Sequence, residues 1–219
     1  MKNKDVLVIG LGCRGRAACE LLRRNGARVM VVDSENNEDL RQRAEQLRPL
    51  GVEVELGVSS PPERVFSLAV WSQTALKNLP LVQAVRRNKV PLIGELELGY
   101  QHASCLSIAI AGTNGKSTTA EMVHRVLSLN NRKAILSGDC ARPVCSVIEQ
   151  TKDLDFLVLQ VNSFQLEGTE FFRPAVAALM NLAPDKGIYV RCPALKTCWR
   201  GQIDYGALRG TPSIGTLRR

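Results

Sequence analysis

The chain has 219 residues, of which 45% are hydrophobic, 23% charged and 5% aromatic. This length and composition allow one large or two modest globular domains and exclude a chain that is disordered overall. The formal net charge is +8, but seven Lys/Arg and one Asp between 186 and 219 leave only +2 on residues 1–185. That balance predicts no nucleic-acid partner, and no run approaches the ~18 apolar residues of a membrane span.

The cysteine pattern predicts free thiols. No CxxC pair is present, and only His102 and His124 could complete a zinc site. We therefore expect reduced cysteines and a cytoplasmic location. The start MKNKDVLVIGLGC has features of a bacterial lipoprotein signal, but Asp5 shortens its apolar run and a glycine motif follows, so export is the less favoured alternative.

Hydrophobic periodicity predicts two successive α/β units. Continuous apolar runs that alternate with helical patterns are typical of parallel sheets covered on both faces. The first unit is expected to have strands at 5–9, 28–32, 52–56, 68–71 and 91–93, and helices at 17–24, 38–47 and 79–88. After a connecting segment, IGELELGYQHASC, the second unit is expected to have strands at 106–111, 133–136, 155–161 and 175–181, and helices at 116–130 and 144–150.

The first unit opens with the glycine motif GLGCRG between a strand and a helix. Gly10, Gly12 and Gly15 have the G-x-G-x-x-G spacing, and Asp33 ends the second strand. Such glycines let the backbone approach a diphosphate at a helix N-terminus, while the acidic residue can bind a ribose hydroxyl. Alone, the motif fits NAD, any other nucleotide diphosphate, or only tight packing of strand against helix.

The second unit contains a more specific motif, GTNGKST, at residues 112–118. It lies between an apolar strand and a helix, where amides can wrap phosphates, Lys116 can neutralise them and Ser117 can hold magnesium. The usual Walker pattern has a glycine five residues before Gly115, where this chain has Ile110. We therefore predict a shortened variant of the phosphate-binding loop.

Two phosphate-binding units in series, the second with GTNGKST, resemble the Mur ligase family of peptidoglycan synthesis. The segments GLGCRG, LIGELEL, VLQVNSFQLE and NLAPD extend the likeness over 5–185, and SFQLE favours the family members that add D-glutamate. The resemblance implies a Rossmann-like domain at 1–100 that binds UDP, not NAD, and a partial P-loop ATPase-like domain at 101–185. It also implies a role in cell-wall biogenesis and division.

The resemblance implies ATP-dependent amide formation, with D-glutamate joined to UDP-N-acetylmuramoyl-L-alanine through an acyl-phosphate, and with Mg²⁺ as cofactor. We expect a monomer that has no membrane partner. The family's site residues fall on the following positions: UDP binding at Gly12, Cys13, Arg14, Asp33 and Ser34; ATP phosphates at Gly112, Thr113, Asn114, Gly115, Lys116, Ser117 and Thr118; metal at Ser117 and Gln160; substrate at Asp139, Asn162 and Ser163. Lys116 is the expected catalytic residue.

Three of these positions, and also Lys186, depart from the family pattern. Gln160 replaces a metal-binding glutamate, Asn162 a serine, Asp139 an asparagine, and Lys186 a histidine. Losing a charged ligand and adding a cation both weaken magnesium binding. The alternatives are therefore a non-catalytic UDP-sugar or nucleotide binder and, with less support, an NAD-dependent oxidoreductase.

Residues 186–219 form a basic, glycine-studded tail without helical or strand period. The family continues here through the rest of its ATPase domain and a third domain, so we expect a truncated chain whose tail is out of frame. A second sheet without its remaining strands should have an exposed edge and an uncovered apolar face.

Overall fold

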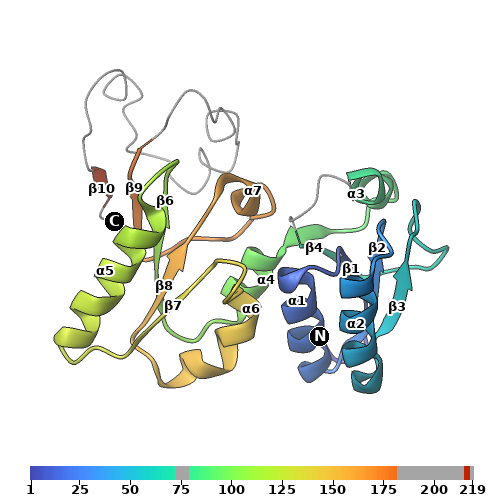
Figure 1. The fold of residues 1–219 in the computed structure, drawn as a ribbon, viewed down its shortest axis with the longest axis horizontal. Coiled ribbons are helices and arrows are strands. Elements are labelled where there is room, and N and C mark those ends of the chain that lie inside the picture. Colours follow the sequence, from blue (N-terminus) through green and yellow to red (C-terminus); the bar gives the residue numbers. More distant parts are fainter. Residues whose placement is uncertain (73–78, 182–214, 218–219) are drawn as a thin grey trace.

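The computed structural model describes residues 1–72, 79–181 and 215–217, and it has two five-stranded sheets, one in each unit (Figure 1). The front sheet has the order β3-β2-β1-β4-β5 with every pair parallel. This is the order of a Rossmann-like sheet, in which ligands bind where the order reverses, here between β1 and β4. The strands are β1 Asp5–Ile9, β2 Arg28–Asp33, β3 Glu53–Leu56, β4 Leu68–Trp71 and β5 Leu92–Gly94.

Both faces of the front sheet are covered, as the continuous apolar strands predict. Side chains alternate along β1: Val6 and Val8 join the core under α1 and α2, whereas Leu7 and Ile9 join a second core with residues of α3. The front helices are α1 Cys13–Arg24, α2 Glu38–Leu47, the short 3-10 helix η1 Arg48–Leu50, and α3 Leu79–Arg87.

The connecting segment IGELELGYQHASC is mostly a helix, α4 Glu95–His102, that the periodicity did not predict. Five consecutive residues of α4, 95–99, are buried, including two glutamates. A helix buried on all sides has no amphipathic stripe from which it could be recognised.

The second sheet has the order β10-β9-β6-β8-β7, and its four strands β6 to β9 are parallel. Helix α5 contacts β6, β7 and β8 (Figure 1). The strands are β6 Leu106–Ala111, β7 Ala134–Ser137, β8 Phe156–Gln160, β9 Val176–Leu179 and β10 Gly215–Leu217. The helices are α5 Lys116–Leu129, α6 Val144–Val147, the 3-10 helix η3 Ile148–Asp153, and α7 Ser163–Leu166.

The tail supplies one strand, contrary to the expectation that it has no strand period. β10 pairs antiparallel with β9, with Thr216 opposite Ala178. An edge strand offers unpaired N–H and C=O groups to any extended segment, so pairing there needs little sequence pattern. On α5, the side chains of Met122, Val126 and Leu129 are each more than half exposed.

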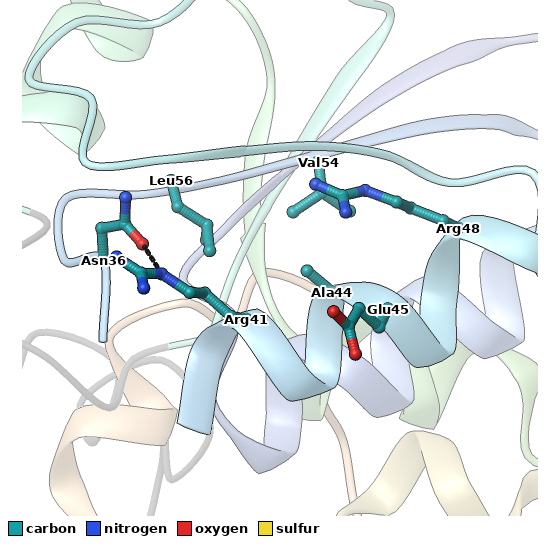
Figure 2. Close-up of a pocket in the computed structure, with 7 residues that line it drawn as sticks. All are labelled: Asn36, Arg41, Ala44, Glu45, Arg48, Val54 and Leu56. Carbon is teal, nitrogen blue, oxygen red and sulfur yellow. Dashed lines mark hydrogen bonds between the residues drawn. The ribbon is translucent and has the colours of Figure 1, made fainter. Parts of the chain in front are cut away.

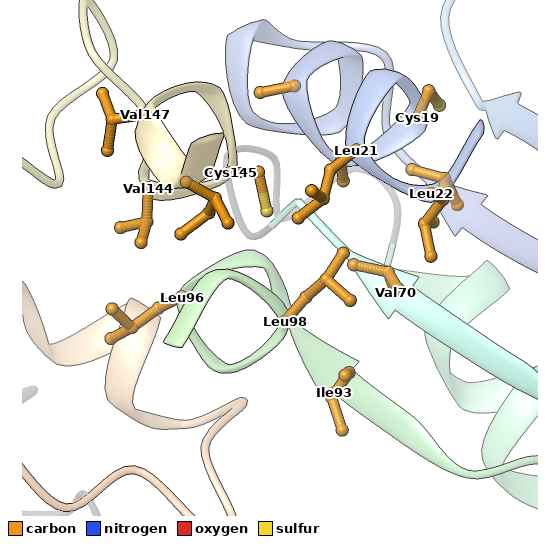
Figure 3. Packing of buried hydrophobic residues seen from close by; sticks show 14 of the residues in the cluster. Cys19, Leu21, Leu22, Val70, Ile93, Leu96, Leu98, Val144, Cys145 and Val147 are labelled. Atoms are coloured by element: carbon orange, nitrogen blue, oxygen red, sulfur yellow. The ribbon is translucent and has the colours of Figure 1, made fainter. Parts of the chain in front are cut away.

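The two units pack against each other through α1, α4 and α6. Leu21 of α1, Leu96 and Leu98 of α4, and Val144 and Cys145 of α6 converge in one buried cluster (Figure 3). The contact between α4 and α6 is so close that a Cβ on Gly99 would lie 2.6 Å from Cγ1 of Val144. One hydrophobic core therefore runs through both units.

The cysteine prediction is wrong for one pair. Cys13 and Cys140 form a disulfide across 127 residues, with Cα atoms 5.8 Å apart, whereas Cys19, Cys105 and Cys145 are free. The reason is the fold: Cys13 follows β1, Cys140 follows β7, and the packing of α1 against α6 brings these two loops together.

Candidate functional site

The GTNGKST segment forms a loop between the end of β6 and the start of α5. Gly112 and Gly115 have φ angles of +147° and +79°, which L side chains rarely adopt. The Lys116 ammonium group turns into the loop and donates to the carbonyls of Gly112 and Thr113 at 2.6 and 3.1 Å. The predicted phosphate-binding residues 112–118 are thus together in one strand-loop-helix turn.

Asn181, which the sequence analysis did not select, fixes this loop. Its side-chain oxygen accepts from the Asn114 amide at 2.9 Å, and its side-chain nitrogen donates to the Asn114 carbonyl at 3.0 Å. Its carbonyl also accepts from the Thr113 amide at 3.1 Å. The NLAPD segment therefore holds the phosphate loop from the end of β9, a role that only the three-dimensional neighbourhood reveals.

Ser117 and Gln160 meet opposite this loop. The Ser117 hydroxyl donates to Oε1 of Gln160 at 2.7 Å, so β8 places its last side chain next to the first turn of α5. Two neutral oxygens suit a magnesium ion that takes its other ligands from a triphosphate and water. Within residues 1–72 and 79–181, no three His, Cys, Asp or Glu side chains gather into a metal group.

The front glycine loop is held by Asp33. One Asp33 oxygen accepts from the Leu11 amide at 2.7 Å and the other from the Glu35 amide at 3.1 Å, and the residue is buried. A Cβ on Gly15 would lie 1.8 Å from the Gly10 carbonyl oxygen, so the third glycine is required by packing alone. Gly12 caps α1, and the first amides of a helix are a ready anion site.

Arg14 points away from this anion site into the junction of the units. The residue is buried, its Nη2 donates to the Gly138 carbonyl at 3.1 Å, and its Nε has no hydrogen-bond partner within the described residues. Burial lowers the pKa of the guanidinium, while the nearby carboxylates of Glu95 and Asp139 oppose that shift. Its side chain thus ties the front loop to the central unit.

The three substrate-side residues lie around the same junction. Asn162 caps α7, accepting from the Gln165 amide at 3.0 Å, while Ser163 is buried beneath it. Asp139 accepts from the Arg142 amide at 2.7 Å in the turn after β7. Lys186, which replaces the family histidine, lies outside the described residues.

Gln165 and Glu97 also make buried polar contacts near the junction, although spacing alone did not single them out. Gln165 donates to the Gly138 carbonyl at 3.0 Å. Glu97 accepts from the amides of Glu170, Phe171 and Phe172 at 2.9 to 3.2 Å. The SFQLE segment therefore owes part of its pattern to a buried contact within the central unit, and the LIGELEL segment to contacts between α4 and residues 170–172.

A pocket of about 320 Å³ opens on the front unit between α2 and β3 (Figure 2). Asn36, whose side chain accepts from Arg41 at 2.8 Å, lies at one end of it. None of the five predicted UDP-binding residues lines it. In the part of the chain that the structure describes, no helix is long and apolar enough to cross a membrane.

Comparison with known proteins identifies relatives for most of the chain, although no protein-family model matches it. It is 37% identical over 188 residues to the UDP-N-acetylmuramoylalanine–D-glutamate ligase of Koribacter versatilis, covering 84% of this chain and 41% of the relative. The enzymes of the same name from Acidobacterium capsulatum and Geobacillus kaustophilus are 37% and 36% identical, with 40% of each covered.

Two solved structures share the fold. UDP-N-acetylmuramate:L-alanyl-gamma-D-glutamyl-meso-diaminopimelate ligase from Neisseria meningitides aligns with a TM-score of 0.53 at 22% identity, covering 90% of this chain and 66% of that one. UDP-N-acetylmuramate-alanine ligase from Thermotoga maritima aligns with a TM-score of 0.52 at 17% identity, covering 90% and 46%. The chain is thus a homologue of the N-terminal part of the UDP-N-acetylmuramoylalanine–D-glutamate ligases, has the fold of Mur ligases, and spans about 41% of its relatives' length.

Proposed function

We propose that this chain carries the UDP-sugar and ATP sites of an amide ligase in peptidoglycan precursor synthesis. The reaction would join D-glutamate to UDP-N-acetylmuramoyl-L-alanine through an acyl-phosphate. The observation that carries the proposal is the loop at 112–118, with Lys116 inside it and Ser117 bonded to Gln160. Because the UDP-sugar and ATP are nucleotide metabolites of the cytoplasm, we place the protein there. We also propose that it is a monomer.

The front unit would bind the UDP portion. Gly12 caps α1, and Cys13 and Arg14 begin this helix, whose first amides suit a diphosphate. Asp33 ends β2 and Ser34 follows it, at the same edge of the sheet. Asp33 already holds two loop amides, so its contribution would be mainly to fix the loop's shape. The Arg14 backbone, not its buried guanidinium, is the part available to the diphosphate.

The central unit would hold the triphosphate. The substrate carboxylate oxygen attacks the γ-phosphorus, the bond to the β–γ bridging oxygen breaks, and ADP leaves with its electron pair. The amine of D-glutamate then displaces phosphate from the acyl carbon and loses a proton. Lys116 and the loop amides would offset the repulsion between carboxylate and triphosphate. Magnesium, held by Ser117 and Gln160, would supply further charge neutralisation.

A non-catalytic UDP-sugar binder is the second candidate, and Gln160 favours it. The side chain keeps an oxygen next to Ser117 at 2.7 Å but carries no charge, which weakens the hold on a divalent cation. Asp139 adds a carboxylate near an anionic substrate.

A binding and turnover experiment separates the candidates. Calorimetric titration of the full chain with UDP, ATP with magnesium, and NAD should show binding of the first two. Phosphate release from ATP that requires both UDP-N-acetylmuramoyl-L-alanine and D-glutamate supports the ligase. Binding of UDP without such release leaves the non-catalytic binder, whereas tight NAD binding without UDP binding would contradict both.

The Lys116→Ala variant tests the loop in the same assay. ATP affinity should fall by about tenfold or more, because the variant removes the cation that lies inside the loop. The exposed Lys152, which pairs with Glu149 at 2.7 Å, provides the matched control as Lys152→Ala. Equal ATP affinities in the two variants would contradict the assignment of 112–118 as the ATP site.

A further inference from the structure

The disulfide between Cys13 and Cys140 lies at the N-terminus of α1, where the proposed diphosphate site is. Cys13 is the first residue of α1 and is half-buried, whereas Cys140 is exposed in the turn that follows β7. Reductants and oxidants in solution can therefore reach this bond. It fastens the front unit's phosphate loop to the central unit at the place where substrate would enter.

The other described cysteines differ from this pair. Cys19 and Cys145 are buried, and burial raises the pKa of each thiol well above its ordinary value. Cys105 is half-buried beside a surface hollow, and burial raises its pKa as well. A thiol at a helix N-terminus is, by contrast, stabilised as the reactive thiolate. The position of Cys13 at the N-terminus of α1 therefore favours it, among these cysteines, as the nucleophile in thiol–disulfide exchange.

The turn that carries Cys140 is compact and places the Asp139 carboxylate beside Cys140. Asp139 accepts from the Arg142 amide at 2.7 Å, and the Arg142 carbonyl accepts from the Gly138 amide at 2.9 Å. With the disulfide closed, this turn is held against the first residue of α1, and the Asp139 carboxylate is near Arg14. An anion approaching the amides of α1 would meet both the sulfur bridge and this carboxylate.

We propose that Cys13 and Cys140 are a reversible redox switch that closes the UDP-sugar site when oxidised. The inference rests on the proposed function, because it assigns a regulation to the same diphosphate site. In the oxidised chain the disulfide holds the Asp139–Cys140 turn at the N-terminus of α1. Reduction frees the Cys140 side chain, while the Gly138 carbonyl keeps its hydrogen bonds from Arg14 and Gln165. The Asp139–Cys140 turn can then move away from α1 while Gly138 stays in place.

The oxidant is a low-molecular-weight disulfide such as oxidised glutathione. The Cys13 thiolate attacks one sulfur, forming a mixed disulfide and releasing one thiol. The Cys140 thiolate then attacks the Cys13 sulfur and releases the second thiol. Two protein thiols and one small disulfide become one protein disulfide and two small thiols, so two electrons and two protons pass to the oxidant. Cytoplasmic disulfides of proteins are commonly redox-sensing, which fits the proposed location.

Peptide mapping tests the bond independently of any ligand. After treatment with oxidised glutathione and trypsin without reductant, peptide 5–14 should be linked to peptide 134–152, and dithiothreitol should separate them. Because the second peptide also contains Cys145, the link should persist in Cys145→Ser and disappear in Cys140→Ser. Absence of the link in the oxidised wild-type chain would overturn the proposal.

UDP titration then tests the gating. The oxidised wild-type chain should bind UDP about tenfold more weakly than the reduced chain. Cys140→Ser should keep the reduced-state affinity under both conditions, and Cys105→Ser, the control, should respond like the wild type. Equal affinities in the two states, with the link formed, would overturn the gating alone. No UDP binding in either state, with the link formed, would overturn the proposed function and the gating together.

Discussion

At the residue scale, Gln160 is the position where this chain departs most directly from the chemistry that its loop predicts. Its Oε1 accepts from the Ser117 hydroxyl, so a carboxylate at the same place would keep that contact and add a negative charge. Gln160→Glu should therefore raise ATP affinity in the presence of magnesium by about tenfold. Titration with ATP, with and without magnesium, measures the change.

The control for Gln160→Glu is Gln150→Glu, which adds the same charge at an exposed position of η3. It should leave the affinity for ATP unchanged with or without magnesium. If Gln160→Glu lowers the affinity with magnesium present, the added charge repels the triphosphate more than it holds the cation, and the metal role of this position is wrong.

Residue-level prediction from the sequence succeeded where a motif has a fixed local geometry. The loop at 112–118 lies between a strand and a helix, as its spacing predicts. Asp33 was expected to bind a ribose hydroxyl, and its contact with the Leu11 amide was not predicted. Asn181 and Gln165 could not be found in this way. Their partners Asn114 and Gly138 are distant in sequence, and only the sheet order brings each pair together.

At the scale of elements, Glu97 connects the linker helix α4 to the segment after α7. The carboxylate is fully buried and accepts from three consecutive amides, at residues 170–172, as well as from Gln101 at 2.7 Å. Glu97→Gln replaces one accepting oxygen with a donor that faces N–H groups. The free energy of unfolding should fall by about 2–3 kcal/mol, because three backbone amides, that of Phe172 in a buried contact, lose their charged acceptor.

Urea denaturation, monitored by circular dichroism, measures this change in the free energy of unfolding. Glu167→Gln, an exposed position just after α7, is the matched control and should change the unfolding free energy by less than about 0.5 kcal/mol. Equal midpoints for the two variants would show that α4 is held by its apolar contacts alone.

The strands were predictable because each is a short, continuous apolar run that alternates with helical patterns along the chain. β1, β4 and β6 have the predicted limits, and the other parallel strands differ from the prediction by one or two residues at their ends. Helix α4 was missed because 95–99 are buried on all sides and include two glutamates. β10 was missed because an edge pairing with β9 depends on where the tail lies and not on its own pattern.

At the scale of the whole molecule, the sequence predicted two units but not how they are joined. The disulfide links residues 127 positions apart, and no cysteine spacing indicates which pair will form. The shared core of α1, α4 and α6 likewise combines helices whose separate patterns carry no information on their mutual packing. This junction is where Arg14 and Glu95 are buried, so the joining of the units has an electrostatic cost as well as an apolar gain.

The electrostatic cost of burying Glu95 can be measured from how the free energy of unfolding depends on pH. It is fully buried, its Oε1 accepts from the Cys145 amide at 2.7 Å, and its Oε2 has no hydrogen-bond partner within the described residues. Burial raises the pKa of this carboxyl above its ordinary value of 4.5, although the Cys145 amide and Arg14 act in the opposite direction. Between these two pKa values the folded chain keeps a proton that the unfolded chain has lost, so stability falls as pH rises through that window.

Glu95→Gln cannot ionise but retains an oxygen for the Cys145 amide. Its unfolding free energy should therefore lack the decline that Glu95 causes in the wild-type chain as pH rises from 4.5 toward the folded-state pKa. Urea midpoints from about pH 4 to about pH 8, with the disulfide kept oxidised, give the comparison. The exposed Glu45, changed to Gln, should preserve the wild-type slope. If stability depends on pH identically in the wild-type chain and in Glu95→Gln, Arg14 keeps Glu95 ionised over the whole range. The junction would then contain a buried ion pair and not a protonated carboxyl group next to a guanidinium.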